Sequence, residues 1–147
     1  MKKVNYRYER KFYTDCTDYQ KVEFYIKKAV GFFAEVYEPR YINNIYFDNF
    51  IFSNYKDNID GNYNRTKSRI RWYGQLFGKI KKPILEQKIK KGLLGTKNYY
   101  PMDEFNFSKD SDFQNIKNNI LSSVGPELVN ETIKNQNAVL INRYKRK

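Results

Sequence analysis

Side-chain character alternates at every second position in three stretches of this chain. Residues 5–13 place mainly aromatic residues on one side and mainly charged residues on the other. Residues 65–74 and 83–91 alternate charged residues with Ser, Ile, Leu, Gln and Trp. A period of two is typical of β-strands with two different faces. We therefore predict strands here, and further extended segments at residues 41–48 and 138–147.

Apolar residues recur at helical spacing in the regions between these strands. A first amphipathic helix is predicted from a cap at Thr17 or Asp18 to about Phe33, because its apolar residues are spaced by three or four positions. The same spacing over residues 111–123 predicts a second helix, and residues 127–134 a short third helix. The pattern predicts that these helices pack against the outside of a β-structure.

Strands and helices in this order predict an α+β domain with an antiparallel sheet that curves into an incomplete barrel. Residues 54–64 are predicted as a turn, because Asp60-Gly61 is the strongest hairpin signal in the chain. Residues 92–97 are predicted as a glycine-punctuated loop. With neither an internal repeat nor a linker, residues 1–147 are predicted as a single domain.

The amino-acid composition of the chain limits the ligands and the kinds of catalysis that it can support. Lys and Arg number 28 against 16 Asp and Glu, a net charge of +12, which favours nucleic acid, an anionic membrane or a polyanionic small ligand. The absence of His excludes Ser-His-Asp catalysis, and the single Cys16 excludes an internal disulfide and a Cys-rich zinc site. With neither a signal peptide nor a membrane-spanning run, we expect a soluble, cytoplasmic protein.

The most informative pattern is a set of cations on one face of two predicted strands. The odd positions of residues 65–73 carry four cations before Tyr73, and a second strand carries Lys88 and Lys90 on one face. A solvated outer face explains each cation singly. Like charges on one face repel each other unless an anion is present. Strands closing into a barrel would turn them inward and form a channel suited to phosphates.

Several short motifs together resemble the VTC domain of the CYTH superfamily of triphosphate tunnel enzymes. They are R-x-E-x-K at Arg7–Lys11, Y-F-D at Tyr46–Asp48, R-I-R-W-Y-G at Arg69–Gly74 and L-E-x-K at Leu85–Lys88. Their order and spacing match the family over almost the whole chain. The third and fourth motifs together are the most specific part of this resemblance.

The resemblance implies a tunnel barrel lined by Lys and Arg, in which family members polymerise polyphosphate from the γ-phosphate of ATP or cleave triphosphates. It implies ATP and polyphosphate or triphosphate as partners and Mn²⁺ or Mg²⁺ as cofactor. Glu9 and Glu86 match acidic positions, as metal ligands or as partners that balance the cations. We interpret Lys67 and Lys90 as solvated or rim positions. The residues that match phosphate-holding, catalytic positions are Lys11, Arg69, Arg71 and Lys88, and those that match further substrate-binding positions are Lys97, Arg146 and, more loosely, Lys56.

One departure concerns the end of the chain. The family continues with further strands that carry another tunnel Arg and a metal-coordinating Glu, whereas the sequence stops at Lys147. We therefore expect an incomplete barrel, from a truncated gene, a fragment or a half that pairs with a second chain, and little turnover by these residues alone. Arg7 replaces the first Glu of the superfamily's E-x-E-x-K motif, as in the polymerase branch.

Three functions remain open at this point: a metal-dependent phosphotransferase, a polyphosphate-binding module without turnover, and a nucleic-acid-binding protein. The third is motivated by the net charge, the many Tyr and Phe residues and the basic tail at residues 143–147. Cations that alternate along strands, without a standard nucleic-acid motif, make nucleic acid the least favoured partner.

Overall fold

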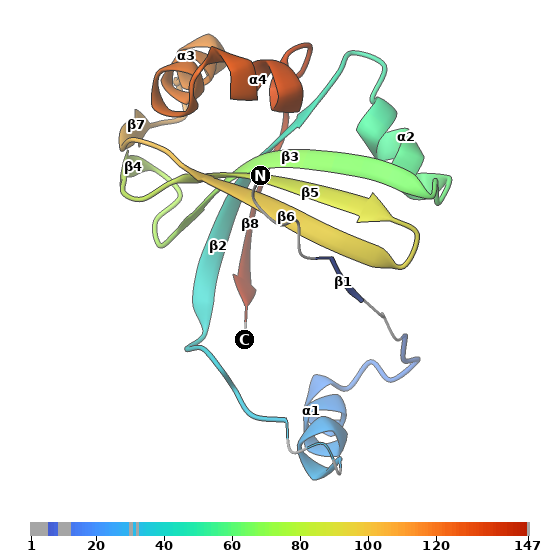
Figure 1. Ribbon diagram of the computed structural model, residues 1–147. Helices are drawn as coiled ribbons and strands as arrows, with labels where there is room; N and C mark the ends of the chain where they lie inside the picture. Colours follow the sequence, from blue (N-terminus) through green and yellow to red (C-terminus); the bar gives the residue numbers. More distant parts are fainter. Residues whose placement is uncertain (1–5, 9–12, 30, 32, 147) are drawn as a thin grey trace.

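The computed structural model describes residues 6–8, 13–29, 31 and 33–146. Strands and helices follow one another along the chain, as Figure 1 shows. The elements are β1 (Arg7–Tyr8), α1 (Tyr19–Lys28), β2 (Arg40–Asp48), α2 (Ser53–Ile59), β3 (Asn64–Tyr73), β4 (Gly78–Ile80), β5 (Ile84–Lys91), β6 (Leu94–Pro101), β7 (Phe105–Phe107), α3 (Phe113–Val124), α4 (Pro126–Ile133) and β8 (Asn137–Arg146).

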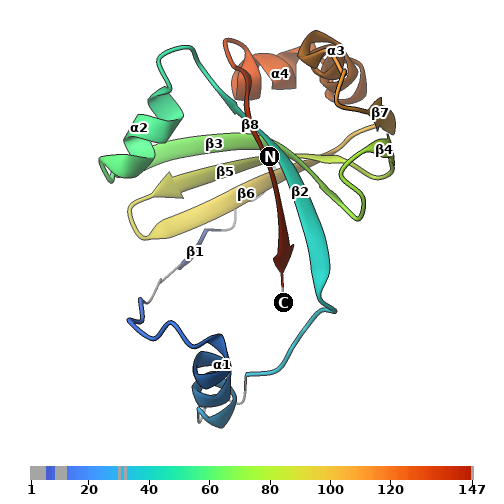
Figure 2. The same cartoon turned by 180° about the vertical axis from the view of Figure 1, so that it is seen from behind.

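A six-stranded sheet in the order β1-β6-β5-β3-β2-β8 forms the body of the molecule, and β4 pairs with β7 separately. Every neighbouring pair is antiparallel. The sheet twists strongly, so that β2 and β8 cross β3, β5 and β6 steeply (Figures 1 and 2). Among the described residues the sheet stays open, because β1 and β8 lie at opposite edges. The predicted α+β class with an antiparallel sheet is confirmed, and no closed barrel is seen in this part of the chain.

The two faces of the sheet differ as the alternation predicted. On β3, Ser68, Ile70 and Trp72 are buried, whereas the cations at the odd positions are only partly buried. On β5, Leu85 is buried on the same face as Ile70, its Cα partner. The core therefore lies on one side of the central strands, and the cations lie on the other.

Helices α3 and α4 cover the core face (Figure 1). Ile116 and Ile120 of α3 and Ile133 of α4 join Trp72 in one buried cluster. The rings of Phe105 and Phe107 on β7 meet Trp72 edge-on, at centroid distances of 6.5 and 5.7 Å. The prediction of helices near residues 111–134 is confirmed to within a few residues.

Helix α2 corrects the prediction that residues 54–64 are only a turn. The buried carboxylate of Asp48, at the end of β2, accepts hydrogen bonds from the backbone N–H groups of Asn49, Asn54 and Tyr55 at 2.8, 3.1 and 3.0 Å. The bonds from Asn54 and Tyr55 satisfy donors in the first turn of α2, which would otherwise lack partners. Only the residues after α2 form the turn, with Gly61 at φ +71°.

Helix α1 is shorter than predicted and lies at the opposite end of the molecule from α3 and α4 (Figures 1 and 2). Asp18 caps it as predicted, by accepting from the N–H groups of Gln20 and Lys21. Its C-cap Ala29 is already extended, which ends the helix before the predicted Phe33. No residue of α1 is buried, so its amphipathic pattern does not lead to packing outside the sheet. None of the described helices is long and apolar enough to cross a membrane.

Strand β6 corrects the loop predicted at residues 92–97, because pairing with β5 runs from Lys91↔Leu94 to Ile84↔Pro101. The turn before it is tight: Gly92 has φ +58°, and a Cβ there would lie 2.3 Å from the ring of Tyr63. The short strands β4 and β7 were not predicted either.

We expect Asp48→Ala to lower the free energy of unfolding by about 2 kcal/mol, because it removes a buried carboxylate that accepts three hydrogen bonds, two of them from the first turn of α2. The matched control is Asp18→Ala, which removes the cap of a helix without buried residues and should cost less than about 0.5 kcal/mol globally. Urea unfolding measures both. Equal losses would contradict the importance assigned to the α2 cap.

Candidate anion-binding site

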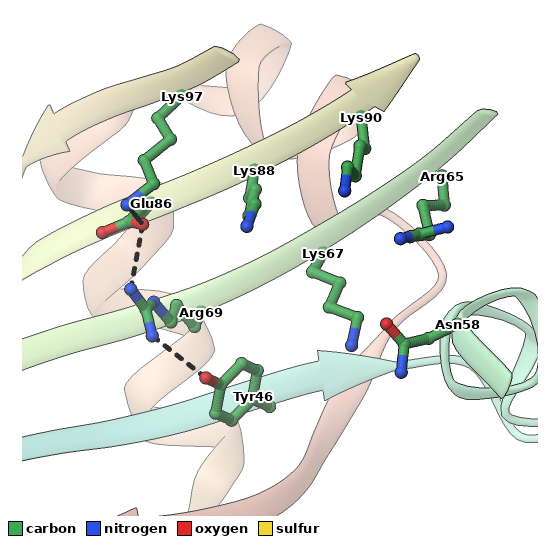
Figure 3. Close-up of a pocket in the computed structure, with 9 residues that line it drawn as sticks. All are labelled: Tyr46, Asn58, Arg65, Lys67, Arg69, Glu86, Lys88, Lys90 and Lys97. Carbon is green, nitrogen blue, oxygen red and sulfur yellow. Dashed lines mark hydrogen bonds and ion pairs between the residues drawn. The ribbon is translucent and has the colours of Figure 1, made fainter. Parts of the chain in front are cut away.

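A pocket of about 230 Å³ opens on the face of the sheet opposite the core. Side chains from β2, β3, β5 and β6 project into it, and α2 closes one end, as Figure 3 shows. Strand geometry places them there, since every second residue of a strand points to the same face. The lining residues are Tyr46, Asn58, Arg65, Lys67, Arg69, Glu86, Lys88, Lys90 and Lys97.

Glu86 is the centre of the charge network at the inner end of this pocket. Its side chain is 1% exposed and lies within reach of three cations from two neighbouring strands. Its Oε1 lies 2.9 Å from Nη2 of Arg69 and 3.2 Å from Nζ of Lys97, and its Oε2 lies 2.8 Å from Nη1 of Arg71. One carboxylate thus joins β5 to β3 on one side and to β6 on the other.

The neighbouring cations determine the protonation state of Glu86. Burial alone would raise the pKa of Glu86, but the charges of Arg69, Arg71 and Lys97 outweigh burial and hold that pKa below its ordinary value. Glu86 is therefore ionised at neutral pH. It offsets one of the three positive charges and leaves the group with a net positive charge.

Arg69 is held at both branches of its guanidinium. One nitrogen donates to Glu86, and the other, Nη1, donates to the hydroxyl of Tyr46 at 3.0 Å. Burial would lower the pKa of Arg69, but Glu86 and Tyr46 raise it above its ordinary value, so Arg69 stays charged. A planar guanidinium fixed in this way is suited to binding two oxygens of one phosphate group.

Hydrogen-bonding capacity remains at the inner end. Among the described residues, Oε2 of Glu86 is engaged by Nη1 of Arg71 in an ion pair at 2.8 Å, whereas the buried Nε of Arg71 has no hydrogen-bond partner. Buried polar groups in folded proteins are rarely left in this condition. The ion-pair network around Glu86 therefore leaves a buried N–H donor, Nε of Arg71, without a partner among the described residues.

The structure brings some of the predicted residues together and separates others. Arg69, Lys88 and Lys97 line the pocket, and Arg71 reaches it through Glu86. Lys11 and Glu9 lie outside the described residues, so their predicted roles stay predictions.

Two further predicted residues lie elsewhere. Lys56 lines an adjoining, more apolar pocket between α2, β2 and β8. This second pocket shares Tyr46 and Lys67 with the 230 Å³ pocket described above, which we call the basic pocket. Arg146 lies at the end of β8 beside α1, opposite Arg40 of β2, and does not line the basic pocket.

Sequence reasoning missed several lining residues. Lys67 and Lys90 were expected at a solvated rim, yet both line the pocket and are partly buried. Arg65 lies on the same face of β3 as Lys67, and this alternation is the sequence signal that could have identified it as a lining residue. Tyr46 stood in a recognised motif without an assigned role. Asn58 gave no signal, because its segment was predicted as a turn.

Comparison with known families decides the identity of this domain. The family model described as VTC domain matches residues 6–147, nearly the whole chain. This chain belongs to the VTC domain family. Searches of curated proteins and of solved structures gave no significant match.

Among the described residues of this VTC domain, no group of three or more Asp, Glu, Cys or His side chains is placed to hold a metal ion. Glu86, the acidic residue of the described pocket lining, is already in contact with three cations, Arg69, Arg71 and Lys97. Its geometry is that of a partner that balances cations, and the Mn²⁺ or Mg²⁺ prediction rests on the family resemblance alone.

We expect Glu86→Gln to destabilise this VTC domain by about 3–5 kcal/mol at pH 7, because three partly buried cations lose their shared counter-charge. Since folding lowers the pKa of Glu86, its contribution is present above an unfolded pKa of about 4.3 and is lost as pH falls through the folded value. The variant should therefore show a flatter loss of stability in acid. Urea unfolding between pH 7 and about pH 3 measures this.

The control is Glu104→Gln, which removes an exposed partner of Lys79 outside the pocket. Exposed ion pairs contribute less than about 1 kcal/mol, so this variant should keep both the stability and the acid dependence of the parent. A Glu86→Gln variant that matches the control would show that the cation network does not depend on Glu86.

Proposed function

We propose that this VTC domain binds triphosphate and polyphosphate anions in the basic pocket. The observation that supports it is the charge of the lining: six Lys and Arg residues against one Glu among the described residues, a net charge of +5. Partly buried cations at this density repel one another in the absence of a ligand. An anion with several charges on adjacent phosphate groups relieves that repulsion at many points at once.

The partly buried setting strengthens each contact with phosphate. The side chains of Arg69 and Lys97 are 16% and 23% exposed, so their charges are screened less than at an open surface. Arg69 offers a fixed fork, whereas Lys88 and Lys97 offer flexible ammonium groups that follow a chain of oxygens. The lining therefore combines one oriented contact with several adaptable ones.

Phosphoryl transfer from ATP to a polyphosphate chain is the reaction that we assign to this site, in keeping with family membership. An oxygen of the terminal phosphate attacks the γ-phosphorus of ATP, the bond from that phosphorus to the β–γ bridging oxygen breaks, and ADP leaves. The protein provides no nucleophile. Arg69, Lys88 and Lys97 would align donor and acceptor and stabilise the charge that develops on the transferred group.

A binding module without turnover is the second candidate. The observation that favours it is the lack of a metal-holding group among the described residues. Mn²⁺ or Mg²⁺ would supply charge neutralisation on the phosphate oxygens, and additional ligands would have to come from outside the described part of this chain. A second chain that completes the barrel at the open β8 edge is a further part of this proposal.

We expect tripolyphosphate to bind with marked salt dependence, because several cations meet one polyanion and release counterions. Arg69→Gln should weaken binding about tenfold or more, since a hydrogen bond to a charged group contributes roughly 1.5–3 kcal/mol. The slope of log K against log salt should fall by about one. Calorimetric titration at several salt concentrations measures both quantities.

Two variants serve as comparisons. Lys88→Gln removes a lining cation from the next row of the sheet and should also weaken binding, whereas Lys109→Gln removes an exposed charge outside the pocket and should not. Single-stranded DNA of equal total charge should bind more weakly than tripolyphosphate. Tighter DNA binding that survives the loss of charge at Arg69 and Arg71 would overturn the proposal. ATP turnover with Mn²⁺, followed as polymer formation, separates the enzyme from the binding module.

A further inference from the structure

Helix α1 takes no part in the core or in the basic pocket. None of its residues is buried, and none lines that pocket. The helix lies at the opposite end of the molecule from α3 and α4, beyond the C-terminal end of β8 (Figures 1 and 2). Helices shorter than about 12 residues are marginal in water without a packing partner, so the two faces of this ten-residue helix indicate what it packs against.

One face of α1 is turned toward the rest of the molecule. Its residues recur at the helical spacing of i, i+3, i+4 and i+7 and line a cavity of about 580 Å³; they are Tyr19, Val22, Glu23 and Ile26. The other walls of this cavity are residues 33–35 and residues 144–146 at the end of β8. This face of the helix is therefore the inner one.

The opposite face of α1 combines two aromatic side chains with two lysines. Lys21, Phe24, Tyr25 and Lys28 have the same i, i+3, i+4 and i+7 spacing, about half a turn around the helix from the inner face, and we call them the outer face of α1. Phe24 and Tyr25 are 53% and 69% exposed, and their ring centroids are 5.9 Å apart. Nζ of Lys28 lies 4.6 Å from the centroid of the Phe24 ring. Two large rings thus lie at the surface between two cations.

Positive charge surrounds this helix. The cations of α1 and of the adjoining ends of β2 and β8 are Lys21, Lys27, Lys28, Arg40, Lys145 and Arg146. Glu23 is the acidic residue of α1, and it forms an ion pair with Lys27 at 2.7 Å. Acidic residues in the segments before α1 and before β2 offset part of the charge, but the charged residues of the outer face are both lysines. The outer face therefore complements an anionic surface.

We propose that the outer face of α1 docks on an anionic phospholipid bilayer. The rings of Phe24 and Tyr25 enter the boundary between headgroups and acyl chains, while the lysines on either side of them contact the phosphates and carboxylates of the headgroups. The basic ends of β2 and β8 add longer-range attraction to the same surface. The helix lies on the bilayer and does not cross it, in keeping with its length of ten residues. This inference does not depend on the proposed function.

A lipid surface fits the outer face of α1 better than a nucleic acid or a folded protein does. Proteins that bind single-stranded nucleic acid provide a basic groove along the backbone, whereas this face is the convex side of one short helix. A stable protein interface takes roughly 20–30 residues from each partner, many more than the outer face offers. A bilayer needs only a few aromatic and basic side chains at one level, and the net charge of +12 attracts it when its lipids are anionic.

The test is co-flotation of the protein with vesicles of phosphatidylcholine alone and of phosphatidylcholine mixed with phosphatidylserine. We expect the parent protein to bind the mixed vesicles about tenfold or more tightly than the neutral ones. Phe24→Gln/Tyr25→Gln should weaken binding to mixed vesicles about tenfold or more, because two rings no longer enter the bilayer. Lys21→Gln/Lys28→Gln should weaken it by about as much, and on the mixed vesicles alone.

Matched controls separate docking from damage to the fold. Gln is a good helix former and α1 has no buried residue, so urea unfolding of both α1 variants should match the parent. Phe50→Gln/Ile51→Gln removes two apolar residues that are 87% and 67% exposed in the loop between β2 and α2, and it should preserve vesicle binding. Lys109→Gln/Lys134→Gln removes two exposed charges far from α1 in the sequence and should preserve most of it.

Three results would overturn the proposal: no vesicle binding by the parent, equal binding to neutral and mixed vesicles, or binding that survives both α1 variants. An equal loss for the Phe50→Gln/Ile51→Gln control would show general apolar adhesion and would also overturn it. Sedimentation gives the remaining outcome. A parent dimer that both α1 variants convert to monomers would assign the outer face of α1 to a second copy of the chain, against the proposal.

Discussion

The ion-pair network around Glu86 is the interaction on which the site depends. One buried carboxylate on β5 contacts two guanidinium groups from β3 and one ammonium group from β6. Without it, partly buried cations from neighbouring strands would face one another with only solvent to separate them. A network of this kind adds little net stability compared with an apolar core of the same volume, but removal of its single anion is costly. Its consequence is positional: it fixes how three strands present their charges on one face.

The same strand register serves the core and the site. On β3, Ile70 and Trp72 are buried under α3 and α4, and Arg65, Lys67 and Arg69, at alternate positions on the other face, line the pocket. A slip of one residue would bury cations among Ile116, Ile120 and Phe107, and would expose Trp72. Packing on one face therefore specifies the positions of the charges on the other. Because the apolar core is large and continuous, it can hold Arg69 and its neighbours close together against their mutual repulsion.

Sequence reasoning succeeded where a local rule decides the outcome and failed where a distant partner does. The period of two assigned Arg65 and Arg69 to one face and Ile70 to the other, because strand geometry requires it. It missed α2, whose first turn depends on the carboxylate of Asp48 at the end of the preceding strand. It overestimated α1, because an amphipathic pattern does not show whether anything covers the apolar face. The positions of Lys56 and Arg146 depend on helix α2 and on the end of the edge strand β8, which motif spacing does not specify.

Lys97 shows how the network also sets what the pocket can bind. Its ammonium group both lines the pocket and contacts Glu86 at 3.2 Å, so an incoming anion competes with a carboxylate that is already in place. An anion with one charge gains little from that exchange, since it replaces one charged contact with another. Under the proposed function, an anion with many charges would gain contacts with Lys67, Lys88 and Lys90 at the same time, and these would outweigh the contact that it displaces. The internal carboxylate would then act as a threshold that favours polyanions over the single phosphates and carboxylates that surround any protein.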